Sequence, residues 1–371
     1  MSPQSDFEVI VLPNINYIIK LVLAFLIAIV VSFATTPLVK RMAYKVGAID
    51  VPKDDRRMHK TPIPRLGGLA IFIAFLFSVL LFADIDRQFQ GILLGAIMIV
   101  ILGVMDDIIT LKALPKFLVQ IAAAGIAVYH GCVIQFVSNP NVFSDYSYVN
   151  LGWVAVPLTI IWIVAITNAV NFIDGLDGLA VGVSAISTAS LLVIALMVGE
   201  WAICIILAAL LGSCLGFIPY NMNPAKIFMG DTGATFLGFV LACLSVQGLF
   251  KFYAVISFAV PFLVLGVPIF DICFAFLRRI LKGQNPMKAD RGHVHHRLID
   301  MGFNQKQAVA ISYMLTAILG LAAVLLTSSG ELKALILIGA VLIVGAFGIR
   351  IVFKKADTQN THSEEEHHEE D

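Results

Sequence analysis

The sequence has few charged side chains and few cysteines. Only 13% of its 371 residues are Asp, Glu, Lys or Arg, and the formal net charge is zero. A soluble domain carries about 25% charged residues, so this scarcity excludes a soluble enzyme, a disordered chain and a nucleic-acid binder. The five cysteines are odd in number and lack CxxC spacing, and most lie within apolar runs. They predict neither a disulfide framework nor a metal site.

Long apolar stretches are what the sequence does have. Hydrophobic residues make up 59% of the chain, enough for about ten or eleven helices of roughly 20 residues each. The sequence therefore predicts an all-α integral membrane protein. Eleven transmembrane spans are expected between the polar, Gly and Pro breaks, at residues 15–36, 67–83, 89–105, 116–131, 153–168, 180–198, 201–218, 234–250, 253–279, 308–328 and 333–353.

Lys and Arg are divided unevenly between the two sets of loops. Twenty-one of the 25 lie in or beside one set and four in the other. Since positively charged loops stay in the cytoplasm, we expect the N-terminus outside and the C-terminus inside the cell. The outer connection 132–150 has strand-forming residues around an Asn-Pro-Asn turn, which predicts a short hairpin. Residues 1–355 are expected to form one domain, followed by an acidic disordered tail over 356–371.

Most of the unusual polar clusters fall in the predicted cytoplasmic loops. A transporter is expected to place its polar residues near the middle of the membrane. Only Asp271, which follows Pro268 within the ninth expected span, fits that pattern, and we interpret it as support for a local helix break. Convergence of the other clusters on one face favours an enzyme that joins a water-soluble substrate to a lipid.

The first cluster is the pair Asp106 and Asp107, where the third expected span ends. Adjacent carboxylates repel each other, which raises the pKa of one and suits a general base. Interfacial capping, or pairing with Lys112 and Lys116, explains the pair equally well. The pair resembles the start of a DDxxD diphosphate motif, but Thr110 takes the last position, which disfavours a prenyl-chain synthase.

The second cluster is the string NAVNFIDGLDGLA, residues 168–180. Asn168, Asn171, Asp174 and Asp177 recur every three residues, and no Lys or Arg neutralises the acids. This pattern favours a bound cation, and hard oxygen ligands suit Mg²⁺, which keeps waters and takes substrate phosphates. A turn between two helices is the alternative interpretation.

The third cluster is NMNPAKIFMGDTGATFLGF, residues 221–239. Asp231 stands between two glycines just before an apolar run. It could cap that helix, or it could bind a metal at a helix N-terminus whose backbone amides face a phosphate. The ring of Phe228 could stack on a base or lie at the membrane interface.

The fourth cluster is a basic loop after the ninth expected span. His293, His295 and His296 alternate along HVHH, beside the cations Lys288, Arg291 and Arg297. The neighbouring cations would oppose a zinc ion, so a pocket for phosphate oxygens is favoured over a metal site or a merely topogenic loop. In the first basic loop, Lys60 and Arg65 are candidates to grip phosphate.

Three strings, NAVNFIDGLDGLA, NPAKIFMGDTG and ADRGHVHH, occur in this order. Together they resemble the polyprenyl-phosphate N-acetylhexosamine-1-phosphate transferases (glycosyltransferase 4 type) over roughly residues 37–305. ADRGHVHHRL is similar to the GlcNAc-1-phosphate branch; the muramyl-pentapeptide branch typically has Pro-His-His-His there. The resemblance implies transfer of GlcNAc-1-phosphate from UDP-GlcNAc to undecaprenyl phosphate, with UMP released, as the first membrane step of a cell-envelope glycan. Phospho-MurNAc-pentapeptide transfer is the alternative, and a multipass transporter is a remote one.

The resemblance also implies roles for single residues. Asp106 and Asp107 match an acidic pair that activates the lipid phosphate, and Asn171 and Asp231 match ligands of Mg²⁺, with Mn²⁺ as the alternative metal. Asp177 matches a uracil-facing position. The further catalytic residues are expected to contact diphosphate or sugar, and they are Lys116, His293, His295 and His296. The remaining residues expected to bind substrate are Lys60, Asn168, Asp174, Phe228 and Arg291. The implied setting is the bacterial cytoplasmic membrane, with the active site on the cytoplasmic face and a homodimer as the assembly.

Overall fold

The computed structural model describes residues 15–52, 61–138, 148–249, 259–281 and 293–329, together with Gly283 and Gly339. Within this part of the chain, long helices make up almost all of the structure. The helices are α1 (Ile15–Val46), α2 (Gly67–Phe82), α3 (Arg87–Ile109), α4 (Ala113–Tyr129), α5 (Ala155–Phe172), α6 (Leu179–Met197), α7 (Trp201–Asn221), α8 (Gly230–Leu249), α9 (Ala259–Val264), α10 (Gly266–Leu281), α11 (Val294–Asp300) and α12 (Gln305–Ser329). The strands are β1 (Ile49–Asp50), β2 (Ile63–Pro64), β3 (Phe136–Ser138) and β4 (Tyr148–Asn150).

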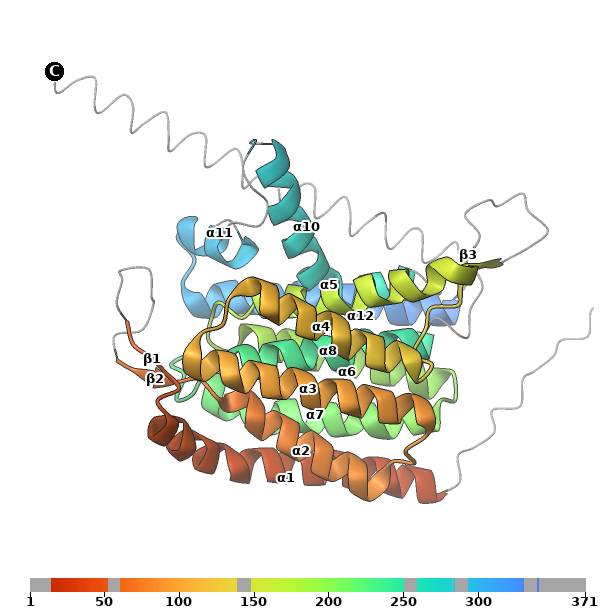
Figure 1. Cartoon of the computed structure of the whole chain (residues 1–371), viewed down its shortest axis with the longest axis horizontal. Coiled ribbons are helices and arrows are strands. Elements are labelled where there is room, and N and C mark those ends of the chain that lie inside the picture. The colour runs from red at the N-terminus through yellow and green to blue at the C-terminus, as the bar shows by residue number, and fades with distance from the viewer. Residues whose placement is uncertain are drawn as a thin grey trace, which may run out of the picture.

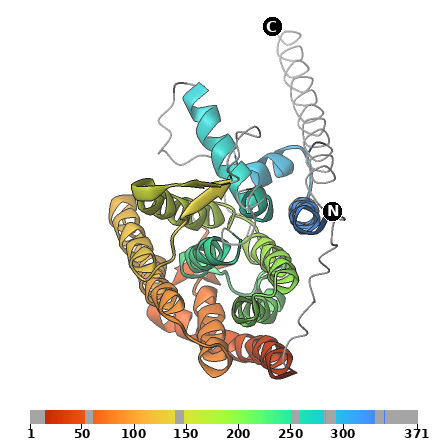
Figure 2. The ribbon, with the colours of Figure 1, turned by 90° about the vertical axis from the view of Figure 1, so that its right-hand side faces the viewer.

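The long helices run side by side as a bundle, and α8 lies at its centre. Figure 1 shows β1, β2 and α11 near one end of the bundle and β3 at the other, while α10 projects away from it. Figure 2 looks along the helices and shows α8 enclosed by its neighbours, which include α2, α3, α5 and α6. A helix that is apolar on every side belongs in such a position.

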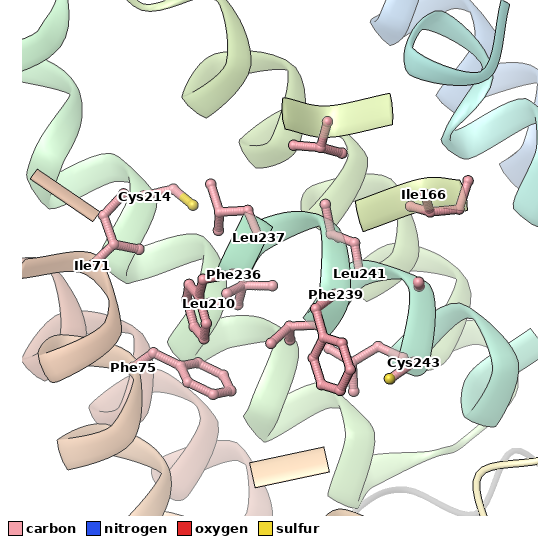
Figure 3. Close-up of a cluster of buried hydrophobic side chains, with 14 of the residues drawn as sticks. Ile71, Phe75, Ile166, Leu210, Cys214, Phe236, Leu237, Phe239, Leu241 and Cys243 are labelled. Atoms are coloured by element: carbon pink, nitrogen blue, oxygen red, sulfur yellow. The ribbon is translucent and has the colours of Figure 1, made fainter. Parts of the chain in front are cut away.

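Side chains from several helices interlock around α8. Phe236 and Phe239 of α8 are fully buried, and Phe75 of α2 meets the Phe236 ring edge-on with the ring centroids 5.5 Å apart. Figure 3 shows these rings with Ile166 of α5 and Leu210 of α7. Because lipid tails are as apolar as these side chains, close packing rather than the hydrophobic effect holds such helices together.

Six of the described helical segments are long and apolar enough to span a membrane. They are Ile15–Val46, Arg87–Ile109, Gly152–Phe172, Leu179–Met197, Trp201–Asn221 and Gln305–Thr327. Two shorter apolar helices, Gly67–Phe82 and Ala113–Tyr129, lie among them. Large apolar side chains are exposed along the outside of the bundle, for example Ile161 and Leu321. This surface belongs against lipid, and the chain is an integral membrane protein.

The first eight expected spans correspond in order to α1–α8. The end of α1 and the form of the ninth span differ from the prediction in an informative way. The break expected at Pro37 does not occur, since α1 continues through this residue to Val46. The described part of the ninth expected span, 253–279, forms two helices, α9 and α10, and they divide close to the local helix break that the sequence predicts at Pro268. Gly266 and Pro268 explain the division, since proline has no N–H to donate to the preceding turn.

The other topological predictions are tested only in part. Strands β3 and β4 pair antiparallel, with Val137 opposite Val149, inside the segment predicted to form a hairpin; residues 139–147 lie outside the described residues. The last expected span, 333–353, and the tail 356–371 also lie outside them, apart from Gly339. The count of eleven spans, the orientation in the membrane and the single domain over 1–355 stay predictions.

Two glycines let α2 and α8 meet closely at the end of the bundle where α11 lies. A Cβ at Gly68 would overlap the backbone of Gly233. Next to this contact, Gly67 N donates to Phe228 O (2.9 Å) and Phe228 N donates to Pro64 O (2.8 Å). The residues after the first basic loop are thereby tied to the segment that leads into α8.

Candidate active site

A cavity of about 580 Å³ lies at this end of the bundle, a size typical of small-molecule sites. Its walls come from segments far apart in the sequence. Six of the residues predicted for the site line it: Asp107, Asp174, Asp177, Phe228, Asp231 and His296. Polar residues that the sequence did not single out also line it: Asp50, Thr61, Asn221, Asn223 and Gln305. Arg65, a candidate from the first loop, lines it as well.

Asp107 holds the beginning of α8. Its carboxylate accepts hydrogen bonds from Asp231 N (3.0 Å), Thr232 N (3.0 Å) and Thr232 Oγ1 (2.6 Å). Gly230, with φ of 72°, leaves room for it, since a Cβ there would lie 2.5 Å from Asp107 Oδ2. One of the two interpretations that the sequence left open has the α8 amides facing a phosphate; the amides of Asp231 and Thr232 donate to Asp107 instead. Asp107 caps α8 from another helix, so the structure adds an anchoring role, and the base role stays a prediction.

Lys116 joins two carboxylates across the site. Its Nζ lies 2.6 Å from Asp106 Oδ2 and 2.5 Å from Asp231 Oδ2. Asp106 Oδ1 also accepts from Leu111 N at 2.6 Å, so both oxygens of Asp106 are engaged. The side chain of Asp231 is 31% exposed, against 9% for Asp106 and 2% for Asp107. Asp231 is therefore the carboxylate of this group that a ligand can reach.

Asp177 fixes the connection between α7 and α8. Its Oδ2 accepts from Asn223 Nδ2 (2.9 Å) and from Ala225 N (3.0 Å). Asn223 Nδ2 also donates to Gln305 Oε1 at 2.8 Å, which brings in the start of α12. The uracil contact predicted for Asp177 stays a prediction, and the structure adds a role in shaping the cavity wall.

Gly178 is clamped by hydrogen bonds to both its N–H and its carbonyl. Its N–H donates to Asn221 Oδ1 (3.1 Å), and its carbonyl accepts from Tyr313 Oη (2.6 Å). Gly178 has φ of 80°, a conformation that glycine adopts at little cost. Residues from α7 and α12 thus hold the loop that carries Asp174 and Asp177. Sequence reasoning missed Tyr313 because one tyrosine in an apolar helix gives no signal of its partner.

Asp174 lies on the cavity wall among other carboxylates. Desolvation, followed by the negative charges of Asp231, Asp107 and Asp177, raises the pKa of Asp174 to about 8. Within the described residues, Lys116 makes ion pairs inside this acidic group, and Arg65 Nε lies 4.0 Å from Asp107 Oδ1. The cavity therefore has a surplus of acidic groups at one wall, which a bound cation would offset.

The three histidines of the basic loop have different surroundings. His296 lines the cavity, whereas His295 is buried against Gly175, where a Cβ would overlap its ring. Desolvation lowers the pKa of His295 to about 4, and the charge of the nearby His296 acts in the same direction. His295 is neutral near pH 7 and adds no positive potential to the site. His293 contacts Asp271, with Nδ1 2.6 Å from Oδ2.

Two described residues of the predicted set, Asn168 and Asn171, lie near the end of α5 and make contacts there. Asn168 Nδ2 donates to Gln120 Oε1 at 2.7 Å, which joins α5 to α4. Asn171 lies in the last turn of α5, where its carbonyl accepts from Asp174 N at 3.2 Å. Neither side chain is among the described residues that line the cavity. Lys60 and Arg291 lie outside the described residues.

The donor atoms at the cavity fit a magnesium ion that is held largely by substrate. Among the described residues, no three His, Cys, Asp or Glu side chains are grouped as an all-protein metal site. Mg²⁺ commonly binds through one or two carboxylates together with water and substrate phosphates. The exposed carboxylate of Asp231, in its acidic surroundings, fits that mode, while the cavity lining does not include Asn171 as a second ligand.

Comparison with known proteins gives one consistent family. Residues 89–249 match the family model described as glycosyl transferase family 4. A probable undecaprenyl-phosphate N-acetylglucosaminyl 1-phosphate transferase of Bacillus subtilis is 42% identical over 84% of this chain and 86% of its own length. A decaprenyl-phosphate N-acetylglucosaminephosphotransferase of Mycobacterium tuberculosis is 31% identical over 89% and 88%. An undecaprenyl-phosphate alpha-N-acetylglucosaminyl 1-phosphate transferase of Escherichia coli is 29% identical over 79% and 78%.

Proposed function

Because this chain belongs to glycosyl transferase family 4, we propose that it transfers GlcNAc-1-phosphate from UDP-GlcNAc to undecaprenyl phosphate. The products are UMP and undecaprenyl-diphosphate-GlcNAc. The relative that is 42% identical over most of both chains is named for this acceptor and this transferred group. The product would start a cell-envelope glycan.

One observation carries the proposal beyond the family names. A polar cavity lies at the end of an apolar helical bundle, so a water-soluble donor and a lipid acceptor can meet there. Its volume of about 580 Å³ lies within the range of about 300–1,000 Å³ that is common for ligand sites. A transporter, the remote alternative, would need polar groups near mid-membrane, and this acidic group lies at the helix ends instead.

The walls of the cavity suggest where the donor binds. Phe228 offers a ring at the wall, and aromatic rings stack favourably on bases. Asn221 and Asn223 supply amides beside Asp177. We place the nucleoside along this side and the diphosphate toward Asp231 and Arg65, because a guanidinium can pair with phosphate oxygens.

The reaction is a phosphoryl transfer between two anions. A phosphate oxygen of the lipid attacks the β-phosphorus of UDP-GlcNAc; the bond from this phosphorus to the bridging oxygen breaks, and UMP leaves with that oxygen. Simple phosphate esters have a second pKa of about 6, so the lipid phosphate is largely dianionic at neutral pH without a protein base. The main demands on the protein are positioning and electrostatic stabilisation.

The chain's own residues meet these demands through a fixed framework. Asp107 sets the first turn of α8, and Lys116 holds Asp231 while offsetting part of its charge. When Mg²⁺ is bound, it neutralises charge on the diphosphate; Asp231 is the residue we propose to hold it. Asp106 and Asp107 then act by orienting these groups, in place of the base role that the sequence suggested.

The loops at the cavity indicate which side of the membrane the active site faces. The cavity lies at the helix ends that are joined by the Lys- and Arg-rich loops, and such loops face the cytoplasm. We therefore propose a bacterial cytoplasmic membrane protein whose active site faces the cytoplasm, where UDP-GlcNAc is made. The homodimer implied by the resemblance remains a proposal.

Release of UMP by the purified protein tests the function. The assay contains detergent, Mg²⁺ and undecaprenyl phosphate, with UDP-GlcNAc and UDP-MurNAc-pentapeptide in parallel reactions. We expect release with UDP-GlcNAc alone, loss of release with EDTA, and recovery on adding Mg²⁺. Release with the pentapeptide alone would show that the acceptor reaction is right and the donor wrong. Release with neither donor, from folded protein, would overturn the proposal.

A further inference from the structure

Asp271 links α10 to α11 through both of its carboxylate oxygens. Oδ2 lies 2.6 Å from His293 Nδ1, and Oδ1 accepts from Val294 N at 2.6 Å. A carboxylate has no proton to donate, so Nδ1 of His293 is the donor in this contact. The two contacts join residues that are 22 and 23 positions apart.

The carboxylate of Asp271 is buried, so it depends on these two partners. Asp271 is only 2% exposed, and a buried carboxylate is costly unless its oxygens are paired. The two oxygens have their partners at the N-cap and at the first residue of α11, so moving α11 would leave the carboxylate unpaired. Asp271 therefore determines where α11 begins.

The position of α11 in turn places His296 at the cavity and His295 behind Gly175, a residue of the cavity wall. His295 is buried against Gly175, and the rings of His293 and His295 are nearly parallel, at 6° and 5.8 Å between centroids. His296, two residues after Val294, lines the cavity. Since α-helical residues rise by about 1.5 Å each, the anchored amide of Val294 lies within one turn of His296.

We propose that Asp271 is a positioning residue for donor binding and acts through His296. This inference rests on the proposed function, because the donor is taken to be UDP-GlcNAc. Asp271 itself is not among the described residues that line the cavity. Its effect should therefore appear in the KM for UDP-GlcNAc and should depend on the presence of the His296 imidazole.

A double-mutant cycle tests the proposal. Asp271→Asn keeps an oxygen for Val294 N but loses the charged acceptor of His293, and we expect roughly a tenfold rise in the KM for UDP-GlcNAc. In a His296→Ala background the same change should have less than about a twofold effect, because coupled residues are not additive. Asp300→Asn, at the exposed far end of α11, is the matched control and should leave the KM unchanged.

A second variant covers the case in which Asp271→Asn does not fold. Val294→Pro removes the N–H that donates to Asp271 and keeps a small apolar side chain, at a first helical position where proline is tolerated. His293 has φ of −65° and ψ of 151°, which a residue before proline readily adopts. We expect a smaller rise in the KM, again absent in the His296→Ala background.

Each outcome has a distinct meaning. If the wild type releases UMP and Asp271→Asn or Val294→Pro lowers kcat/KM equally with and without His296, the proposed function stands and this inference is overturned. The inference is also overturned if Asp300→Asn raises the KM as much as Asp271→Asn does. If the folded wild type releases no UMP with UDP-GlcNAc, the proposed function fails and the inference falls with it.

Discussion

At the scale of single residues, Lys116 is the ion-pairing centre of the acidic group. It contacts Asp106 and Asp231 at 2.6 and 2.5 Å, so it offsets two carboxylates and fixes the direction of the one that is exposed. The sequence predicted a contact to diphosphate or sugar for Lys116. The structure shows that its ammonium group is already shared by two carboxylates of the protein.

We expect Lys116→Gln to lower turnover by at least about a hundredfold, because removing one partner of a part-buried charge group leaves the others uncompensated. Lys112→Gln is the matched control, since Lys112 is exposed one turn earlier at the start of α4. UMP release is measured for both variants at saturating Mg²⁺. Equal activity of the two variants would contradict the role given to Lys116.

His295 gives a prediction for the pH dependence of stability. Its folded pKa of about 4 lies below the ordinary value of 6.5, so the unfolded chain binds the extra proton first as the pH falls. Stability is therefore full above about pH 6.5 and declines toward pH 4, by at most about 3 kcal/mol from this group.

His295→Gln removes that titrating ring. We expect the loss of thermal stability between pH 7 and pH 5 to be smaller in His295→Gln than in the wild type, as measured by the midpoint of thermal unfolding in detergent. A decline of the same size in both proteins would show that His295 does not titrate as described.

At the scale of structural elements, the loop between α5 and α6 is fixed by its neighbours. Tyr313 of α12 donates to the carbonyl of Gly178, and Asn221 of α7 accepts from its N–H. The string NAVNFIDGLDGLA predicted a loop with a binding role but did not indicate these partners. Hydrogen bonds between distant helices leave no periodic signal in a single sequence.

Tyr313→Phe tests the clamp. The ring stays and the hydroxyl is lost, so the Gly178 carbonyl keeps only the hydrogen bond from Gly182 N (3.0 Å). Loss of one hydrogen bond of this kind costs about 0.5–1.5 kcal/mol. We expect a severalfold rise in the KM for UDP-GlcNAc with little change in kcat. Tyr44→Phe, at an exposed site on α1, should match the wild type. An unchanged KM in Tyr313→Phe would contradict the clamp.

The contact of α2 with α8 also depends on a single residue type. A Cβ at Gly68 would overlap the backbone of Gly233, which cannot move aside as a flexible side chain could, whereas a Cβ at Gly125 of α4 meets nothing within 4 Å. We expect Gly68→Ala to lower the thermal midpoint and to abolish UMP release. Gly125→Ala should be neutral or stabilising by up to about 1 kcal/mol. Similar behaviour of the two alanine variants would contradict the described packing.

The sequence predicted most helices because membrane spans have a strong compositional signal. The spans that became α2 and α6 were placed within one residue at each end. The compositional signal could not reveal α11, whose start depends on the partner of one carboxylate. The division of the ninth span was indicated only by Pro268, through the local helix break that it predicts. α1 runs through Pro37 because tertiary packing can outweigh the cost of a missing hydrogen bond.

At the scale of the whole molecule, the site exists only when distant segments come together. The residues that end α3, link α5 to α6 and begin α8 were identified from the sequence, since acidic residues are rare in so apolar a chain. The fold adds Asn221, Asn223 and Gln305, whose amides are common in ordinary loops. It also shows that Asn168 serves the contact between α4 and α5.

The central claim is that the phosphate next to the sugar moves to the lipid with the sugar. The most direct measurement uses UDP-GlcNAc radiolabelled at its β-phosphate, with undecaprenyl phosphate, Mg²⁺ and the purified protein. The account predicts that the label enters the organic phase in step with UMP release, and that Asp231→Asn loses both. Label that stays in the aqueous phase while the sugar alone reaches the lipid would contradict it.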